Sequence, residues 1–247
     1  MRLAIGSPCQ NICSLDPMTS LPPHVLVAEK VSLTRGETRV LHGIDAVFER
    51  NEVSTVVGPS GSGKTSLLRC LNRLEEPEEG RVLLDSADIR SVEPTALRRR
   101  VGMIFQVPLL FAGDVRSNLR YGLEGLVEQK MVECLEASGL PASFLDRDAQ
   151  ALSVGQAQRA CIARALVRDP EVLLMDEPTS SLDKDASARI ESLIGSLVAD
   201  GLTIVLVTHD LGQAKRVGSR ALLLVEGTVV ASGTPADVEE RWPEGVT

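Results

Sequence analysis

The sequence predicts an α/β fold in which helices cover both faces of a mostly parallel sheet. Its second half alternates apolar, strand-like runs, "EVLLMDE" and "LTIVLVTH", with amphipathic helical stretches such as "ARIESLIGSLV". This alternation is typical of strand–helix–strand units, which build parallel sheets. A further strand-like run, "EVSTVVG", leads directly into a glycine-rich segment and a helix that begins near Lys64.

The first part of the chain adds a tail and an antiparallel layer. Residues 1–23 carry four prolines without clear periodicity, so we expect a flexible tail, in which Met18 is an alternative start. We expect one domain over residues 24–247. The runs "HVLVAEKVSLT" and "RVLHGIDAVFE" alternate as β-strands do and predict an N-terminal antiparallel β layer. The runs "RVLL" and "VGMIF" indicate short strands, and "ALLLVEGTVVASG" indicates a hairpin that turns at Glu226 and Gly227.

Between about residues 107 and 155 the pattern becomes helical. The stretch "MVECLEASGL" and its surroundings contain no convincing strand. We therefore expect a helical subdomain inserted into the α/β core.

Composition and charge exclude several classes of protein. The net charge is −8, which argues against broad nucleic-acid binding, so we expect no nucleic-acid partner. No apolar run approaches the roughly 18 residues of a membrane span, so any membrane part must come from another subunit. The five cysteines are scattered, and Cys9 and Cys13 lack a second pair for a zinc site. We expect reduced thiols in a cytosolic protein.

The segment "GPSGSGKT" fits the phosphate-binding pattern GxxxxGK followed by Ser or Thr, between a strand and a helix. Glycines let backbone N–H groups surround phosphates, and the following helix presents its positive end to the same anion. Lys64 is expected to reach the β- and γ-phosphates, and Thr65 to offer its hydroxyl to Mg²⁺. The sequence thus predicts a P-loop NTPase core that binds a nucleotide. The expected nucleotide-binding residues of this loop are Gly58, Pro59, Ser60, Gly61, Ser62, Gly63, Lys64, Thr65 and Ser66.

A carboxylate pair follows the strand in "EVLLMDEPTSSLD". Asp176 ends the strand at the edge where parallel sheets bind ligands, which places it to hold Mg²⁺. Glu177 points differently and is a candidate general base for water, a role worth about 10²–10⁴-fold in rate. The plainer interpretation is a strand end and a helix cap. His209 ends the next buried strand and would reach the γ-phosphate, although a lone histidine is usually structural. Gln106 follows "VGMIF" and would contact Mg²⁺ and the water.

Together these motifs resemble the ATP-binding subunits of ABC transporters, over about residues 25 to 235. The resemblance rests on "GPSGSGKT" (Walker A), Gln106 (Q-loop), "LSVGQ" (signature), "VLLMDE" (Walker B), "SSLD" (D-loop) and His209 (switch histidine). In this family two copies pack head to tail, so the resemblance implies a dimer in which each signature loop contacts ATP held by the other Walker A loop. The residues implied at the signature and D-loop are Ser153, Gly155, Gln156 and Asp183.

The resemblance also implies membrane partners. The chain has one Walker A motif, which fits a stand-alone subunit that docks on separately encoded permease chains. The helical insertion would touch them, and the protein would sit in the cytoplasm, peripherally on the inner face of the cell membrane. Closing and opening of the dimer would then drive the permease.

Three positions depart from the family pattern. Val154 stands where the signature usually has glycine, which is tolerable if its φ stays negative and its side chain points away from phosphate. Arg35 occupies the usual place of an adenine-stacking aromatic; it would stack its guanidinium on the base, unless it is a solvated loop arginine. Asn51 replaces a turn glycine, and asparagine tolerates left-handed backbone conformations. We expect the signature loop to work.

The cargo and the subtype stay open at this stage. "LSVGQAQRACIARALVRDPEVLLMDEPTSSLD" resembles phosphate-import ATPases, whereas "PLLFAGDVRSNLRYG" resembles small two-component systems such as iron exporters or the subunit linked to aluminium tolerance. A soluble ABC ATPase, such as an iron–sulfur assembly component, is an alternative. A non-hydrolysing regulatory subunit is another. A chromosome or repair ATPase would show a long heptad insertion, and none is present.

Overall fold

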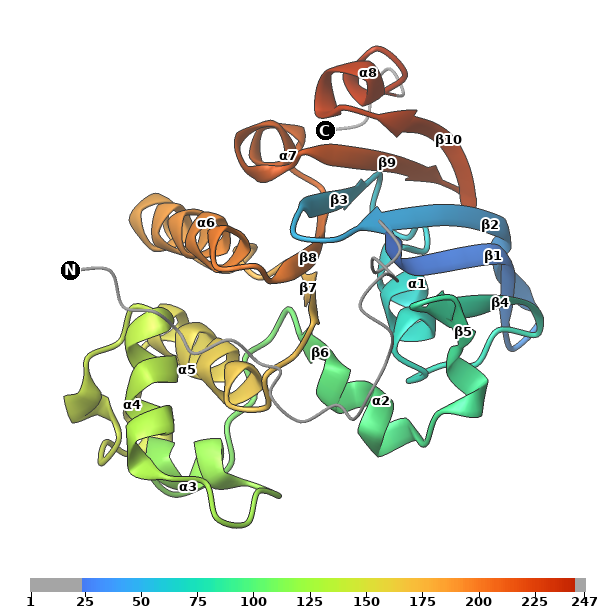
Figure 1. The fold of residues 1–247 in the computed structure, drawn as a ribbon. Coiled ribbons are helices and arrows are strands. Elements are labelled where there is room, and N and C mark those ends of the chain that lie inside the picture. Colours follow the sequence, from blue (N-terminus) through green and yellow to red (C-terminus); the bar gives the residue numbers. More distant parts are fainter. Residues whose placement is uncertain (1–23, 243–247) are drawn as a thin grey trace, which may run out of the picture.

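The computed structural model describes residues 24–242 (Figure 1). The expected tail 1–23, with Cys9, Cys13 and Met18, lies outside the described residues. Within residues 24–242 the chain folds into two sheets and a set of helices, in agreement with the predicted α/β class.

The first sheet is antiparallel, as the alternating N-terminal runs predict. Its strands follow the order β2-β1-β4-β5. Their bounds are His24–Arg35 for β1, Thr38–Glu49 for β2, Glu79–Leu84 for β4 and Ala87–Asp88 for β5. In β2, Ile44, Ala46 and Phe48 are buried in alternation with exposed residues, because successive residues of a strand point to opposite faces. The pattern of β1 is interrupted by register shifts, and it buries neighbouring residues such as Val25 and Leu26.

The second sheet carries the predicted parallel core. Its order is β10-β9-β3-β8-β7-β6, and all pairs are parallel except β9 with β10. The bounds are Val53–Val57 (β3), Val101–Ile104 (β6), Val172–Asp176 (β7), Thr203–Thr208 (β8), Arg220–Val225 (β9) and Thr228–Gly233 (β10). Every residue of β3, β7 and β8 is buried, as expected where helices cover both faces of a parallel sheet.

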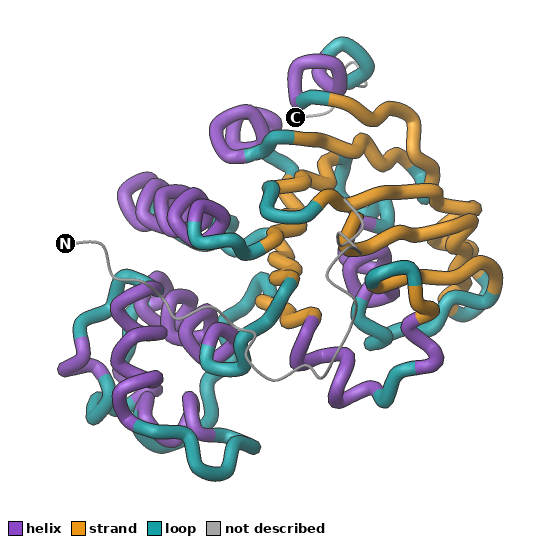
Figure 2. The backbone as a smooth tube through the Cα atoms, in the orientation of Figure 1, coloured by secondary structure: helices purple, strands orange, loops and turns teal. Residues whose placement is uncertain are grey.

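The helices are placed in layers around this sheet (Figure 2). α1 lies between the two sheets and contributes to one large hydrophobic core. α5 and α6 pack on the opposite face of the parallel sheet and form a second core. α7 and α8 cover the end near β9. The bounds are Lys64–Leu71 (α1), Pro94–Arg100 (α2), Val115–Arg120 (α3), Glu128–Ala137 (α4), Val154–Leu166 (α5), Lys184–Ala199 (α6), Leu211–Val217 (α7) and Pro235–Glu239 (α8).

The segment 107–155 forms a helical lobe, drawn in green and yellow at the lower left of Figure 1. It holds α3, α4 and short 3-10 turns at Ala142–Phe144 and Ala149–Ala151. Its apolar cluster continues into α5 through Ala160 and Ala163. The lobe is therefore packed onto the α/β core by a helix that begins at its boundary.

Two turns confirm predictions made from single residues. Glu226 and Gly227 both have positive φ, 47° and 72°, and connect β9 to β10 as the predicted hairpin. Asn51 has a φ of 57°, so asparagine does adopt the left-handed conformation that glycine usually supplies at such a turn.

The described cysteines provide a test of this packing. Cys70, Cys134 and Cys161 are buried free thiols, and burial raises the pKa of Cys70 to about 12 and that of Cys134 to about 11. Because the thiolate is the reactive form, a variant with Cys9→Ser and Cys13→Ser should react with Ellman's reagent at less than about one equivalent when native at pH 8. Unfolding in guanidinium should release all three thiols. Fast reaction of the native variant at all three would contradict the packing.

Candidate functional site

The glycine-rich loop connects β3 to α1, and its backbone requires glycine at defined points. Gly58, Gly61 and Gly63 have φ values of 150°, 78° and 101°, a region that side chains strongly disfavour. A Cβ on Gly58 would lie 2.0 Å from the carbonyl oxygen of Leu224, and one on Gly63 would lie 2.8 Å from that of Val40. Because Gly58 and Gly63 have no side chain, the loop can lie directly against β9 and β2.

Lys64 is held over this loop by neutral acceptors. Its Nζ donates hydrogen bonds to the carbonyl oxygens of Gly58 at 2.8 Å and Pro59 at 2.7 Å, and the residue is only 5% exposed. Burial lowers the pKa of Lys64, while the carboxylates of Glu177 and Asp176 oppose that shift. A cation so close to the loop is placed to attract an anion bound by it.

The hydroxyls of the loop differ in their partners. The Oγ of Ser62 is buried and has no hydrogen-bond partner, whereas Thr65 Oγ1 donates to Asp176 Oδ1 at 3.0 Å. A buried hydroxyl without a partner is costly, unless a ligand supplies one. The loop therefore fits an oxyanion ligand. Of its other residues, Ser60 is exposed and Ser66 is buried within α1.

Sheet order explains why distant motifs meet. The strands β3, β8, β7 and β6 are neighbours. The loop at Gly58, His209 and Gln106 come after the ends of β3, β8 and β6, and Asp176 is the last residue of β7. Because parallel strands end at the same edge, these groups gather there. All four predicted sites are thus brought to one edge of the sheet.

Glu177 is the centre of a polar cluster at this edge. Its Oε2 lies 3.0 Å from His209 Nδ1 and accepts a hydrogen bond of 3.4 Å from Gln106 Nε2. Gln106 also donates to Ser180 Oγ at 3.2 Å. Ser180 was missed as a site residue, although it belongs to the "SSLD" motif. The cluster joins the three side chains that the sequence analysis expected to act on water and phosphate.

The backbone explains why Asp176 and Glu177 point differently. Asp176 is the last residue of β7, whereas Glu177 has a positive φ of 44°, which is rare for a residue with a long side chain. Asp176 is 5% exposed, and burial raises its pKa against the opposing hydrogen bond from Thr65. The left-handed turn sends Glu177 toward His209 instead. Such strain is found where the surrounding structure holds a residue in a functional position.

The signature segment begins α5. Ser153 caps the helix through a reciprocal capping box: its Oγ accepts from Gln156 N at 3.4 Å, and Gln156 Oε1 accepts from Ser153 N at 3.0 Å. Val154 is the first helical residue and, in the described chain, is not among those with positive φ. The backbone condition set for Val154 is met. Gly155 faces α6, since a Cβ built on it would lie 3.4 Å from Ala186 Cβ, at van der Waals contact.

The signature and the D-loop share a recess of about 500 Å³. Ser153, Gly155, Gln156 and Asp183 all line it, and Asp183 also caps α6 by accepting from Ala186 N at 2.8 Å. Val154 lines it too and is half exposed, and the second condition, that its side chain points away from phosphate, stays a prediction. The lining residues include none of the P-loop. Within one chain the two loops therefore form separate sites.

Arg35 lies at the end of β1, where its guanidinium is held by Glu75. Its Nε donates to Glu75 Oε2 at 3.3 Å, and its Nη2 pairs with the other carboxylate oxygen. The side chain is 45% exposed. Base stacking by Arg35 stays a prediction.

Comparisons with known proteins agree with this geometry. Residues 41–180 match the family model described as ABC transporter. The chain is 47% identical over 214 residues to Protein STAR1 of Oryza sativa, covering 85% of this chain but 62% of that protein. It is 39% identical to Phosphate import ATP-binding protein PstB 2 of Lactobacillus acidophilus, covering 85% of this chain and 90% of that one.

A solved structure shows the same fold. CbiO1 from Clostridium perfringens, described as part of the ABC transporter complex cbiONQ, superposes with a TM-score of 0.82 at 28% identity. The match covers 89% of this chain and 92% of that one. No helix within residues 24–242 is both long and apolar enough to cross a bilayer. With a P-loop and a carboxylate cluster at one sheet edge, and with these relatives, the chain belongs to the ABC transporter family, as an ATPase domain that binds and hydrolyses ATP.

Proposed function

We propose that this chain powers a membrane transporter by binding ATP with Mg²⁺, closing as a head-to-tail dimer and reopening after hydrolysis. The observation that carries the proposal is the separation of the P-loop from the signature recess within one chain. The P-loop and the signature loop of one chain do not line the same site. In a head-to-tail dimer, the signature loop of each copy would contact the ATP that the P-loop of the other copy holds.

The roles proposed for single residues follow from their contacts. Lys64, which is buried beside the loop carbonyls, moves its Nζ to the β- and γ-phosphates when ATP enters. Thr65 and Asp176, already 3.0 Å apart, hold Mg²⁺ together with phosphate oxygens and water. Within residues 24–242 no group of three or more His, Cys, Asp or Glu side chains could hold a metal ion. This agrees with a cation that phosphates and water help to bind.

The polar cluster at Glu177 supplies the proposed hydrolytic machinery. Glu177 accepts the proton of the attacking water or orients that water, and His209 and Gln106 contact the γ-phosphate and Mg²⁺ respectively. Their hydrogen bonds to Glu177 hold its carboxylate near the position that the water would take.

The cargo is proposed from the relatives. Phosphate import is the first candidate, because a relative with that printed name is 39% identical and 90% covered. A small metal or iron-export-type system is the second candidate. The cargo site belongs to the permease, so the partner decides between them. A soluble ABC ATPase in iron–sulfur assembly is the alternative of another class, and co-purification with a multi-span protein would argue against it. The proposed location is the cytoplasm, at the inner face of the membrane.

Replacing Lys64 with alanine should reduce ATPase activity by about 100-fold or more, because phosphate binding loses its charged contact. Steady-state phosphate release and binding of a fluorescent ATP analogue measure the effect. Lys215→Ala, which removes an equal charge at a surface ion pair with Glu239, is the matched control and should keep wild-type rates. Wild-type turnover by Lys64→Ala would refute the assignment of this loop.

Replacing Glu177 with glutamine should trap a dimer. The amide keeps the size of the carboxylate and cannot accept the water's proton, so hydrolysis should fall by about 10²-fold or more. In size-exclusion chromatography with light scattering, ATP and Mg²⁺ should move the variant to about twice the 26.5 kDa mass of the chain. A monomer at saturating, verified ATP binding would count against the dimer and leave ATP binding intact.

Replacing Val154 with glycine should change ATPase activity by less than about threefold. Val154 already has a helical backbone and a half-exposed side chain, so glycine gains little room and costs at most about 1 kcal/mol of helix stability. The measurement is turnover at saturating ATP, with circular dichroism as a check on folding. A manyfold increase would instead identify the valine as a brake on the signature loop.

A further inference from the structure

A recess of about 590 Å³ lies between α6 and α7, next to the proposed hydrolytic cluster. Glu177 and His209 line this recess, and so do Glu191 of α6 and Gln213 of α7. In Figure 1 the two helices are neighbours to the left of β8 and β3. Hydrogen bonds reach from α7 to α6 beside the recess, so polar side chains connect the two helices at this point.

Gln213 is a buried polar residue to which the proposed hydrolytic machinery gives no role. It is only 2% exposed. Its Nε2 donates to Thr179 Oγ1 at 2.9 Å and to Glu191 Oε1 at 3.1 Å. One amide group therefore joins three segments of the chain, which are α7, α6 and the turn that follows Glu177.

Glu191 is a fixed acceptor for this amide. Its two carboxylate oxygens accept from Arg216, at 2.9 Å from Nε and 2.8 Å from Nη2, and such a bidentate pair restricts the orientation of the carboxylate. The hydrogen bonds from Arg216 lower the pKa of Glu191, with a further contribution from Gln213 and against the effect of burial. An ionised carboxylate only accepts hydrogen bonds, so it must face the nitrogen of the Gln213 amide. We call Gln213, Thr179, Glu191 and Arg216 the Gln213 network.

Thr179 belongs to the turn that sets the direction of Glu177. The backbone N–H and the hydroxyl of Ser180 both donate to Glu177 O, at 3.2 and 3.1 Å, which closes this turn. Glu177 itself has the positive φ of 44°, and such a conformation persists only where the surroundings hold it. Gln106 holds the turn from the side of β6 through Ser180, and Gln213 holds it from the side of α7 through Thr179.

The helix α7 also continues from the segment that carries His209. Asp210 precedes the first residue of α7, and Gln213 lies in the first turn of this helix. Arg216 of the Gln213 network donates to Asp210 Oδ2 at 3.4 Å. The network thus connects the segment of His209 with the segment of Glu177, beside the 3.0 Å contact between those two side chains.

We propose that Gln213 is a positioning residue for ATP hydrolysis, which holds Glu177 at its distance from His209 through Thr179 and Glu191. This deepens the proposed function and rests on it for the roles of Glu177 and His209. Gln213 acts through these residues and not on the water or the nucleotide. Its effect on rate is large because a catalytic group displaced by about 1 Å can lose about 10²-fold in rate.

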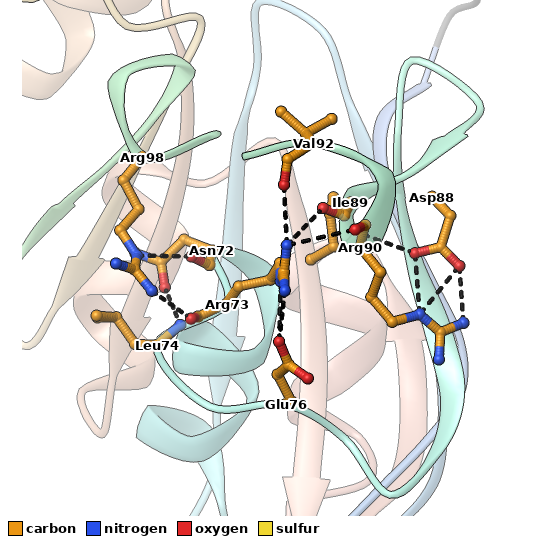
Figure 3. Close-up of polar contacts among 9 residues, drawn as sticks. All are labelled: Asn72, Arg73, Leu74, Glu76, Asp88, Ile89, Arg90, Val92 and Arg98. Carbon is orange, nitrogen blue, oxygen red and sulfur yellow. Dashed lines mark hydrogen bonds and ion pairs between the residues drawn. The ribbon is translucent and has the colours of Figure 1, made fainter. Parts of the chain in front are cut away.

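The helix that begins with Lys64 is secured by a different set of contacts. Beyond the end of α1, Arg98 donates to the carbonyl oxygens of Asn72 and Arg73, at 3.3 and 2.6 Å (Figure 3). Arg73 Nη1 in turn donates to Val92 O at 2.9 Å. These residues do not belong to the Gln213 network, so its loss should slow turnover and leave the affinity for ATP close to the wild-type value.

The first test replaces Gln213 with methionine, which is similar in length and volume but cannot donate a hydrogen bond. The kcat for ATP should fall about tenfold or more, whereas the dissociation constant of a fluorescent ATP analogue should change by less than about twofold. Phosphate release gives kcat, and circular dichroism checks folding. If Gln213 only stabilised α7, the variant would lose stability but keep the wild-type kcat per folded molecule.

Gln129 provides the matched control. It is an exposed glutamine of α4, and its Nε2 also donates to a glutamate, Glu133 Oε1, at 3.0 Å. Gln129→Met removes the same kind of hydrogen bond away from the site. This variant should keep the wild-type kcat and ATP affinity.

Thr179 provides an independent variant, which also serves if Gln213→Met does not fold. Thr179→Val keeps the shape of the side chain and removes the oxygen that accepts from Gln213, so kcat should fall about as much as in Gln213→Met. Thr179→Ser keeps the hydroxyl and should retain most of the activity. In the double variant, kcat should fall by less than about twofold beyond Thr179→Val, because the hydrogen bond is already lost.

A Glu177→Gln background separates positioning of Glu177 from any other effect of Gln213. With no carboxylate left to position, adding Gln213→Met should lower the residual single-turnover rate by less than about twofold. A full tenfold loss in this background would overturn the proposal. Wild-type kcat in folded Gln213→Met and Thr179→Val, or a loss of ATP affinity equal to the loss of kcat, would overturn it as well.

The same proteins distinguish failure of this proposal from failure of the proposed function. Slow turnover in Glu177→Gln together with wild-type turnover in Gln213→Met would contradict the role of Gln213 alone. Wild-type turnover in Glu177→Gln would instead contradict the proposed hydrolytic role of Glu177, and the positioning role of Gln213 with it.

Discussion

The parallel pairing of β3 with β8, of β8 with β7 and of β7 with β6 is the constraint on which the site depends. Strands that run in one direction deliver their following residues to one edge, so the P-loop, His209, Asp176 and Gln106 meet there although they lie far apart in sequence. The pairing itself depends on burial. Helices and the antiparallel sheet cover both faces, which explains why β3, β7 and β8 are apolar throughout.

At that edge, charge is held in a low-dielectric setting by short-range contacts. Lys64 rests on two backbone carbonyls, and Asp176 accepts from Thr65. Burial lowers the pKa of Lys64 and raises that of Asp176, so it disfavours the charged form of both groups. An anionic ligand beside Lys64 and a cation beside Asp176 would stabilise these charged forms. The strained backbone at Glu177 belongs to the same arrangement, because it separates two adjacent carboxylates into two different surroundings.

The signature loop is positioned by the packing of α5 against α6. The start of α5 at Gly155 lies against α6, and the signature and the D-loop line one recess away from the P-loop. Near its other end, Arg164 lines a second recess together with Arg98 and Arg99 of α2. A single helix of the lobe thus contributes to both surfaces, and its capping box at Ser153 fixes where it begins.

The fold class, the order of most strands along the chain, the hairpin at Glu226 and the left-handed turn at Asn51 could all be predicted from the sequence. Local pattern suffices for these, because apolar period and turn residues act over a few neighbours. It also singled out Lys64, Asp176, Glu177, His209 and Gln106 by motif. The contacts of Glu177 with His209 and Gln106, and the packing of the P-loop against β2 and β9, appear only in the folded molecule. Those facts depend on contacts between residues distant in sequence, which no local pattern encodes.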